Sequence, residues 1–296
     1  MPEVILVTQQ EFAKGEKVFR ATRDFDIQPA APQEQTLADA VLKHNCRAVI
    51  VGVEPYRGPL YAALGKTGGA IIARFGVGHD SVDKVQARQH NIVVTNTPGV
   101  LDVSVAEQTM WLIGCLVRRV AHLHGRFRAG EFAGLTGTEV RGKTLGLIGL
   151  GGIARRVVAI AHFGFGMRVI AAGRRLAEQI TAAPGVERYT NDAEAVLREA
   201  DIVSIHLPAN AETRHYVNAT RLALMKPGAL LINTGRGSLV DEAALHDALA
   251  SGQLAGAGLD VFEREPYVPA SPDKDLRKRD NVVFTPHIGS NTREAN

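Results

Sequence analysis

Short apolar runs alternate with longer amphipathic stretches along almost the whole chain. In the first third, runs that favour strands occupy residues 4–8, 48–53, 70–75 and 92–95. Stretches with helical spacing lie between them, including residues 34–44 and 80–90. Strands separated by helices predict a parallel sheet covered by helices on its faces. Residues 1–97 are therefore predicted to form a first α/β domain.

The same alternation fills the second half of the chain. Strands are expected at residues 202–206, 229–233, 257–261 and 282–285, and helices at residues 192–200, 218–225 and 241–251. Asp241 suits the N-cap of the last helix, and Gly252 suits its C-terminal end. This half is predicted to be a second α/β domain.

A turn and one unusually apolar helix separate the two patterns. Asn-Thr-Pro-Gly at residues 96–99 is a turn signal and a candidate hinge. The helix predicted at residues 103–124 is apolar over much of its circumference. Such a helix is buried, either in its own domain or against a second subunit. We expect it to contribute to a homodimer interface.

The stretch from residue 144 to residue 172 has the strongest sequence signal. An apolar run at residues 145–148 is followed by Gly149-Leu150-Gly151-Gly152-Ile153-Ala154, an amphipathic helix and a second apolar run at 167–172. Strand, glycine turn, helix and strand in this order form a dinucleotide-binding unit. Gly149 permits the tight turn, Gly151 lets the backbone approach a pyrophosphate, and the helix N-terminus attracts it. The alternative is an ordinary glycine-rich turn.

Composition narrows the class of protein. The net charge of +3 is too small to indicate nucleic acid as the main partner. Cys46 and Cys115 lie in apolar runs and form neither a disulfide framework nor a metal cluster, so no metal is expected. The N-terminus has no signal-peptide pattern, and the helix at 103–120 is too short and charged to cross a bilayer. We expect a soluble cytoplasmic protein without membrane contact.

Three later strand ends carry residues that suit catalysis. Arg236 lies between two glycines and can present its planar fork to a carboxylate. Residues 259–266 offer three carboxylates after another strand. His287 follows the last strand, and a carboxylate beside it would orient the ring and favour its protonated form. Such a histidine can act as a general acid. Taken singly, a solvated arginine and a surface histidine are the simpler interpretations.

Several motifs in one order resemble the D-isomer-specific 2-hydroxyacid dehydrogenase family. They are Gly76-Val77-Gly78-His79-Asp80, Asn96-Thr97-Pro98-Gly99, the glycine turn, His206-Leu207-Pro208, Met225-Lys226-Pro227-Gly228, residues 233–237, 259–266 and 285–290. The resemblance implies two doubly wound parallel-sheet domains of α/β class. Residues 1–97, rejoined by 286–296, would form a flavodoxin-like substrate domain, and residues 98–285 a Rossmann domain that binds the dinucleotide.

The resemblance also implies the functional residues. The catalytic group would be Arg236, Glu265 and His287, with Glu265 chosen over Glu263 because it precedes Pro266. Residues matched to substrate binding are Gly76, Val77, Gly78, Arg236 and Ser290. Residues matched to the cofactor are Gly149, Gly151, Gly152, Ile153, Arg174, Arg175, His206, Pro208, Thr234 and Asp260, with Asp260 on the nicotinamide carboxamide.

The chain departs from the family pattern at two places. In the family a helix follows the histidine loop, whereas this chain stops at Asn296, so we expect a truncated C-terminus. Members that use NAD carry an acidic residue after the second strand, which binds the ribose hydroxyls. Here that position is Gly173, followed by Arg174 and Arg175. The arginines favour NADP over NAD, with two exposed arginines on a turn as the alternative.

These inferences converge on an oxidoreductase. The expected reaction is transfer of hydride from NADPH to a small 2-keto acid such as glyoxylate or hydroxypyruvate, which gives the D-2-hydroxy acid. One alternative is a nucleotide-sensing binding protein like the corepressor members of the family. Another is a dehydrogenase acting on phosphoglycerate, phosphite or formate.

Overall fold

The computed structural model describes residues 2–175 and 183–296, which form two α/β units. One unit comprises Met1–Leu101 with Arg293–Asn296, and the other comprises Asp102–Thr292. The sequence instead assigns residues 286–292 to the first domain. The structure keeps them in the second unit because the backbone N–H groups of Ile288 and Gly289 donate to the carboxylate of Asp260.

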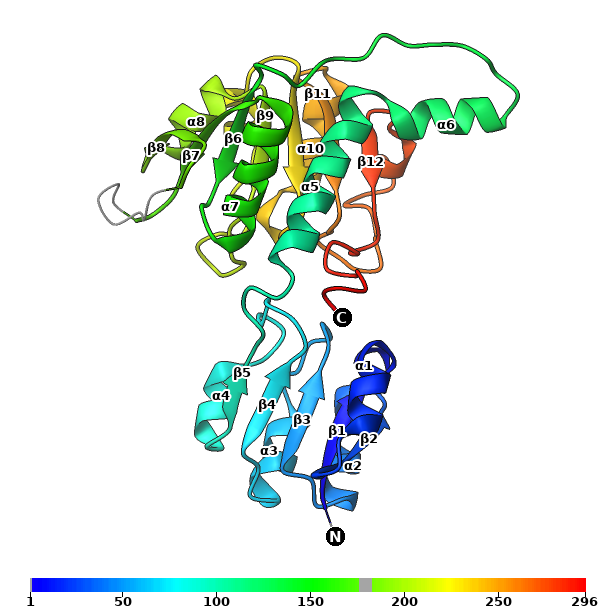
Figure 1. Cartoon of the computed structure of the whole chain (residues 1–296), viewed down its shortest axis with the longest axis vertical. Helices are drawn as coiled ribbons and strands as arrows, with labels where there is room; N and C mark the ends of the chain where they lie inside the picture. The colour runs from blue at the N-terminus through cyan, green and yellow to red at the C-terminus, as the bar shows by residue number, and fades with distance from the viewer. Residues whose placement is uncertain (1, 176–182) are drawn as a thin grey trace. The chain divides into compact units, whose positions relative to one another are not determined.

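The first unit is a five-stranded parallel sheet in the order β2-β1-β3-β4-β5 (Figure 1). Its strands are β1 (Glu3–Thr8), β2 (Phe25–Ala30), β3 (Ala48–Val51), β4 (Ile71–Arg74) and β5 (Val93–Thr95). Its helices are α1 (Gln9–Ala21), α2 (Glu34–Lys43), α3 (Pro59–Lys66) and α4 (Lys84–Gln89). Val49 and Ile72, from the central strands, are fully buried. This strand order is the flavodoxin-like one, as the resemblance implies.

The second unit is a seven-stranded parallel sheet in the order β12-β11-β10-β9-β6-β7-β8. Its strands are β6 (Thr144–Ile148), β7 (Arg168–Ala172), β8 (Val186–Thr190), β9 (Ile202–Ile205), β10 (Ala229–Asn233), β11 (Leu254–Leu259) and β12 (Val282–Phe284). This is the Rossmann order, and it reverses direction between β6 and β9. Ligands of such sheets bind beyond the carboxyl ends of the strands at that point.

The second unit has six α-helices among the described residues. They are α5 (Asp102–Val117), α6 (Val120–Arg128), α7 (Gly152–Val158), which continues as the π-helix η1 (Ala159–Gly164), α8 (Ala193–Glu199), α9 (Ala219–Leu224) and α10 (Glu242–Ala250). Polar side chains cap the N-termini of three of them, α8, α9 and α10. Two short 3₁₀ turns, η3 (Gly237–Leu239) and η4 (Leu276–Lys278), lie in the loops. The side chain of Asp241 accepts the Ala244 N–H at 3.0 Å, and Gly252 has φ +79°, which confirms both predicted ends of α10.

The single helix predicted at residues 103–124 is wrong. The chain breaks after α5, where Arg119 adopts the left-handed conformation with φ +53°, and α6 begins at the next residue. One face of α5 packs on the sheet through residues such as Ala106 and Ile113. In contrast, α6 extends away from the sheet (Figure 1). None of its nine residues, all of which the structure describes, is buried.

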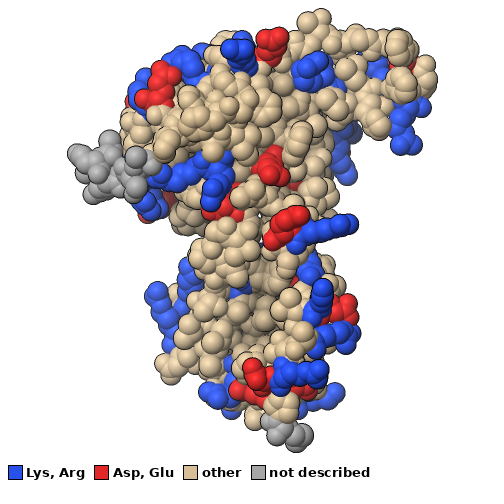
Figure 2. Space-filling view, viewed as in Figure 1, with Lys and Arg blue, Asp and Glu red and all other residues tan. Residues whose placement is uncertain are grey.

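The surface carries both signs of charge. Figure 2 shows lysine and arginine side chains interspersed with aspartate and glutamate on the face in view. Within residues 2–175 and 183–296, no helix is both long and apolar enough to span a membrane.

Candidate active site

The glycine turn lies where the strand order of the second sheet reverses. Gly149 follows β6 with φ +100°, a conformation that favours glycine. A Cβ at Gly149 would lie 2.4 Å from the carbonyl oxygen of His206, the residue after β9. The His206 N–H in turn donates to the carbonyl of Ile148 at 2.7 Å. Glycine is therefore required here for both its conformation and its lack of a side chain.

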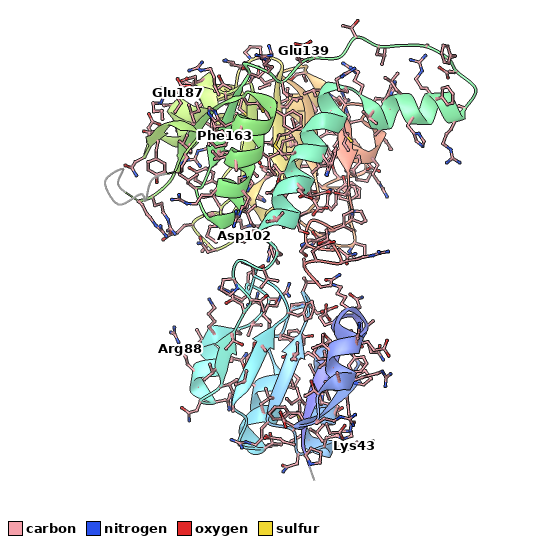
Figure 3. All side chains as sticks on the ribbon, in the orientation of Figure 1. Lys43, Arg88, Asp102, Glu139, Phe163 and Glu187 are labelled. Atoms are coloured by element: carbon pink, nitrogen blue, oxygen red, sulfur yellow. The ribbon has the colours of Figure 1, made fainter. Side chains whose placement is uncertain are left out.

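The next residues of the turn leave room for an anion. Gly151 is the N-cap of α7, and a Cβ there would meet no atom within 4 Å. A Cβ at Gly152 would lie 2.1 Å from Oδ2 of Asp102, which begins α5 beside the start of α7 (Figure 3). Ile153 is half-buried, and Ala154 is fully buried. The open space at Gly151, beside the N–H groups that begin α7, fits a dinucleotide pyrophosphate.

The remaining residues matched to the cofactor follow β7, β9, β10 and β11 at the same edge. Pro208 lies in the loop that follows His206. Burial lowers the pKa of the His206 ring to about 4, so this ring is neutral at pH 7. Its Nε2 lies 2.9 Å from Oγ of Ser204. Thr234, after β10, is 7% exposed, and its hydroxyl lies 2.9 Å from that of Thr109. The sheet therefore gathers these residues around one edge.

Arg236 lies in the loop between β10 and η3, and this loop is held by its own backbone. The Asn233 side chain donates to the carbonyl of Arg236 at 2.8 Å, and its Oδ1 accepts the Gly235 N–H at 3.1 Å. The guanidinium of Arg236 donates to the carbonyl of Gly235 at 2.8 Å. The side chain is half-buried, and a guanidinium is the kind of group that can bind a carboxylate through two N–H donors.

Glu265 and His287 form a hydrogen-bonded pair. Nδ1 of His287 lies 2.7 Å from Oε2 of Glu265, with the side chains 27% and 34% exposed. Partial burial alone would raise the pKa of Glu265, but the contact with His287, the Phe262 N–H and the charge of Arg236 together hold it below its usual value. Glu265 is therefore an anion at neutral pH. It can orient the ring and stabilise an imidazolium, while Nε2 is left to serve a ligand.

Asp260 organises the loop that carries His287. It is 1% exposed, and its carboxylate accepts the hydroxyl of Thr285 and the N–H groups of Ile288 and Gly289, the latter at 3.0 and 2.8 Å. The His287 N–H donates to the Asp260 carbonyl at 2.8 Å, and His287 itself has φ +53°. This ordering role is not evident from the sequence. The predicted contact between Asp260 and a nicotinamide carboxamide stays a prediction.

Polar residues of α5 bind two of these loops, the loop after β12 and the loop that carries Arg236, which sequence reasoning did not anticipate. Oγ of Ser104 lies 2.5 Å from Oγ1 of Thr292, and the Gln108 amide donates to Oγ1 of Thr285 at 2.9 Å. Thr109 contacts the arginine loop through Thr234, as described above. Polar side chains inside an otherwise apolar helix were the signal that could have identified this role.

The segment matched to substrate binding, residues 76–78, belongs to the first unit. It follows β4, and Gly76 has φ +132°. Its carbonyl accepts the Thr97 N–H at 3.0 Å, and the carbonyl of Val77 accepts the Asn96 amide at 2.7 Å. Ser290, which is matched to substrate binding together with Arg236, lies in the second unit directly after the residues bound by Asp260. A joint role of these residues in binding substrate stays a prediction.

The arginine pair after β7 lies on a restrained turn. The carbonyl of Arg175 accepts the Tyr189 hydroxyl at 3.0 Å and the Asn191 amide at 2.7 Å. The Arg174 guanidinium pairs with Glu212 at 3.0 Å, but both side chains are about three-quarters exposed. Such an exposed pair contributes little free energy, so Arg174 can exchange Glu212 for another anion.

Comparison with known proteins identifies the family. The sequence model of the D-isomer specific 2-hydroxyacid dehydrogenase NAD binding domain matches residues 110–289. The chain is 42% identical to the glyoxylate reductase of Thermococcus litoralis over 234 residues, 76% of this chain and 69% of that protein. It is 42% identical to the hydroxypyruvate reductase of Thermotoga maritima over 231 residues, 76% of this chain and 72% of that protein. The structure of an NADPH-dependent glyoxylate/hydroxypyruvate reductase from Sinorhizobium meliloti, in complex with NADP and malonate, superposes with a TM-score of 0.84 at 31% identity and covers 100% of this chain and 90% of its own.

Proposed function

This chain belongs to the D-isomer specific 2-hydroxyacid dehydrogenase family, and we propose that it reduces glyoxylate or hydroxypyruvate with NADPH as the hydride donor. Family membership makes it an NAD(P)-dependent oxidoreductase. The observation that carries the proposal is the pair formed by Glu265 and His287, 2.7 Å apart, in the unit that also contains the glycine turn. The names of the relatives support the two substrates.

His287 acts as the proton donor in this proposal. A bound nicotinamide nucleotide supplies the hydride that reduces C2 of the keto acid. The developing alkoxide then needs a proton, and an imidazolium held by an anionic carboxylate is suited to deliver it. Glu265 fixes the ring through Nδ1, so the proton leaves from Nε2.

Arg236 binds the carboxylate of the substrate and polarises the adjacent carbonyl. Its guanidinium can form two parallel hydrogen bonds to one carboxylate, which fixes the orientation of a small keto acid as well as its charge.

The alternatives have less support. A nucleotide sensor of the corepressor type would bind the cofactor without useful turnover, whereas the relatives reported above are named as reductases. Steady-state turnover of a 2-keto acid separates these possibilities.

The cofactor preference follows from Gly173, Arg174 and Arg175. Gly173 has no side chain to repel a 2′-phosphate, and a hydrogen bond to a charged group is worth about 1.5–3 kcal/mol, or roughly 10- to 150-fold in affinity. We therefore expect kcat/KM to be at least about tenfold higher with NADPH than with NADH. Arg174→Ala should raise KM for NADPH and leave KM for NADH almost unchanged.

Two further variants test this assignment. Glu212→Gln removes the partner of Arg174 and should retain or increase the preference for NADPH. An acid at position 173 should reverse the preference, but a Cβ there would lie 2.6 Å from the Tyr189 hydroxyl. Gly173→Asp is therefore best made together with Tyr189→Phe, with Tyr189→Phe alone as the control. Equal use of both coenzymes by the wild type would show that Arg174 and Arg175 do not bind the 2′-phosphate of NADPH.

We also propose a homodimer assembled through α6 and the outer face of α5. Trp111, Phe127 and Phe132 are 69%, 63% and 94% exposed, and a nine-residue helix without buried residues is not stable by itself. A hollow of about 590 Å³ at the base of α6, lined by residues such as Leu116 and Val283, offers a surface for the second copy.

Light scattering should give twice the 31.8 kDa mass of one chain at micromolar concentration. Phe127→Glu combined with Phe132→Glu should shift the mass toward the monomer, because it places charges in the apolar contact. Phe163→Glu alters another phenylalanine of similar exposure, 66%, outside α5 and α6, and should leave the dimer intact. A monomeric wild type would contradict the assignment.

A further inference from the structure

Two further carboxylates, those of Glu242 and Glu263, lie close to the pair formed by Glu265 and His287. Glu242, the first residue of α10, is 4% exposed, and its Oε1 accepts the backbone N–H of Glu263 at 2.7 Å. The backbone N–H of Glu242 donates in return to Oε1 of Glu263 at 3.3 Å. Oε2 of Glu263 contacts Nε2 of His215 at 2.8 Å and the Arg214 guanidinium at 3.3 Å. The start of α10 and the loop after β11 are thus joined by two reciprocal hydrogen bonds.

This connection lies where the loops that carry Arg236 and Glu265 meet. A Cβ at Gly237, next to Arg236, would lie 1.8 Å from the carbonyl carbon of Phe262 and 2.3 Å from the nitrogen of Glu263. The two backbones are therefore in direct contact. A displacement of the Phe262–Glu263 peptide would move both loops.

Two carboxylates hold consecutive N–H groups at this point. The Phe262 N–H donates to Oε1 of Glu265 at 3.0 Å, and the next N–H, that of Glu263, donates to Glu242. The other oxygen of Glu265 contacts His287. Glu242 is therefore connected to the ring of His287 through the backbone of Phe262 and Glu263 and the side chain of Glu265.

We propose that Glu242 is a positioning residue, which holds the 262–265 segment so that Glu265 meets His287 in the geometry needed for proton transfer. The inference rests on the proposed function of Glu265 and His287. Glu242 does not contact the substrate in this account. Its effect on the reaction is exerted through the Glu263 N–H and through its charge.

The titration of Glu242 supports a role beyond packing. Burial raises the pKa of Glu242 to about 7; the charges of Glu263 and Glu265 add to the rise, whereas the Glu263 N–H and His215 oppose it. Tyr267 also interacts electrostatically with this carboxyl, and Arg214 pairs with Glu263, which contacts it. The pKa of this carboxyl is higher in the folded protein than its usual value of 4.5. The folded protein therefore loses stability as the pH rises from 4.5 to about 7. A neutral glutamine side chain would avoid that loss.

The test compares Glu242→Ala with Glu242→Gln. The alanine variant leaves the Glu263 N–H without its acceptor, and we expect kcat for glyoxylate to fall roughly 10- to 100-fold, as expected for a misplaced catalytic group. The dissociation constant of NADPH should stay within about twofold of the wild type. The side-chain amide of the Glu242→Gln variant can still accept that N–H, so this variant should recover most of kcat and be no less stable than the wild type at pH 8. It should also lose reduction at a lower pH, because one negative charge is absent.

A matched control separates this role from support of α10. Asp241→Ala removes the N-cap of the same helix but leaves the Glu263 N–H bound, so it should lower Tm without lowering kcat. Wild-type kcat and pH profile in Glu242→Ala would overturn the proposal. A parallel fall of kcat and coenzyme affinity in both Glu242 variants would also overturn it, because that pattern indicates general damage.

A titration that does not depend on activity makes the test independent of the proposed function. The ring ¹⁵N signals of His287, identified by their loss in His287→Ala, should titrate at a lower pH in Glu242→Ala than in the wild type. Unchanged titration would contradict the positioning role even if the wild type reduced no keto acid. Absence of turnover in a wild type with the expected titration would contradict only the proposed function.

Discussion

Replacing His287 with alanine should lower kcat for 2-keto acid reduction by about 10²–10⁴, the range expected for loss of a positioned proton donor. KM for the keto acid and the affinity for NADPH should change little, because the glycine turn and Arg236 are untouched. Stopped-flow measurement of NADPH oxidation gives the chemical step directly. Retention of more than about a tenth of wild-type kcat would show that another group supplies the proton.

Two companion variants identify the source of the effect. His246→Ala removes another histidine that contacts a carboxylate, Asp247 at 3.4 Å, and should leave kcat unchanged because that partner belongs to the same helix and not to the loops that carry Arg236, Glu265 and His287. Glu265→Gln should shift the loss of reduction to lower pH, since the anion beside the ring favours the protonated form. A pH profile unmoved by Glu265→Gln would exclude Glu265 from this role.

Replacing Arg236 with alanine should lower kcat/KM for glyoxylate by about 10²–10⁴, because two hydrogen bonds to a charged carboxylate are worth about 1.5–3 kcal/mol each. Arg236→Lys should recover only part of this loss, since an ammonium cannot reproduce the bidentate fork. Coenzyme affinity, measured by quenching of protein fluorescence, should stay close to that of the wild type.

Arg277→Ala is a suitable control for the loss of a guanidinium. Arg277 pairs with Asp275 on the η4 turn, and its removal should leave kcat/KM unchanged. A collapse of coenzyme affinity together with kcat/KM in Arg236→Ala would indicate that Arg236 maintains the loop between β10 and η3 instead of binding substrate.

Much of the fold could be predicted because apolar runs of strand length alternate with helical spacing. The strand predicted at residues 229–233 matches β10 residue for residue. The failures are at edge strands and at the ends of elements. β2 contains Pro29 and is largely exposed, and β8 is polar, so neither carries the apolar signal of a buried strand. The strand expected at residues 257–261 corresponds to β11, which begins earlier, at Leu254. The sequence pattern did not indicate its first residues because Gly256 interrupts the apolar run.

The candidate site, like the fold, could be predicted from the sequence only in part. Glycine spacing predicted the turn at residues 149–154, and the resemblance to a family supplied Glu265 and His287, which the structure places within hydrogen-bond distance. The supporting residues were not predictable, because Glu242 and Gln108 lie far from their partners in the sequence. Only the fold brings a buried helix N-terminus against the loop after β11. The break at Arg119 was also hidden, because two arginines are compatible with a continuing helix.

The proposed activity of this protein is the reduction of a 2-keto acid with NADPH to the D-2-hydroxy acid. The most direct test is a panel of glyoxylate, hydroxypyruvate, pyruvate and 3-phosphohydroxypyruvate with NADPH and with NADH, followed by chiral analysis of the product from hydroxypyruvate. We predict the highest kcat/KM for glyoxylate or hydroxypyruvate with NADPH, and D-glycerate as the product. Tight binding of NADPH without turnover of any keto acid, or formation of L-glycerate, would contradict it.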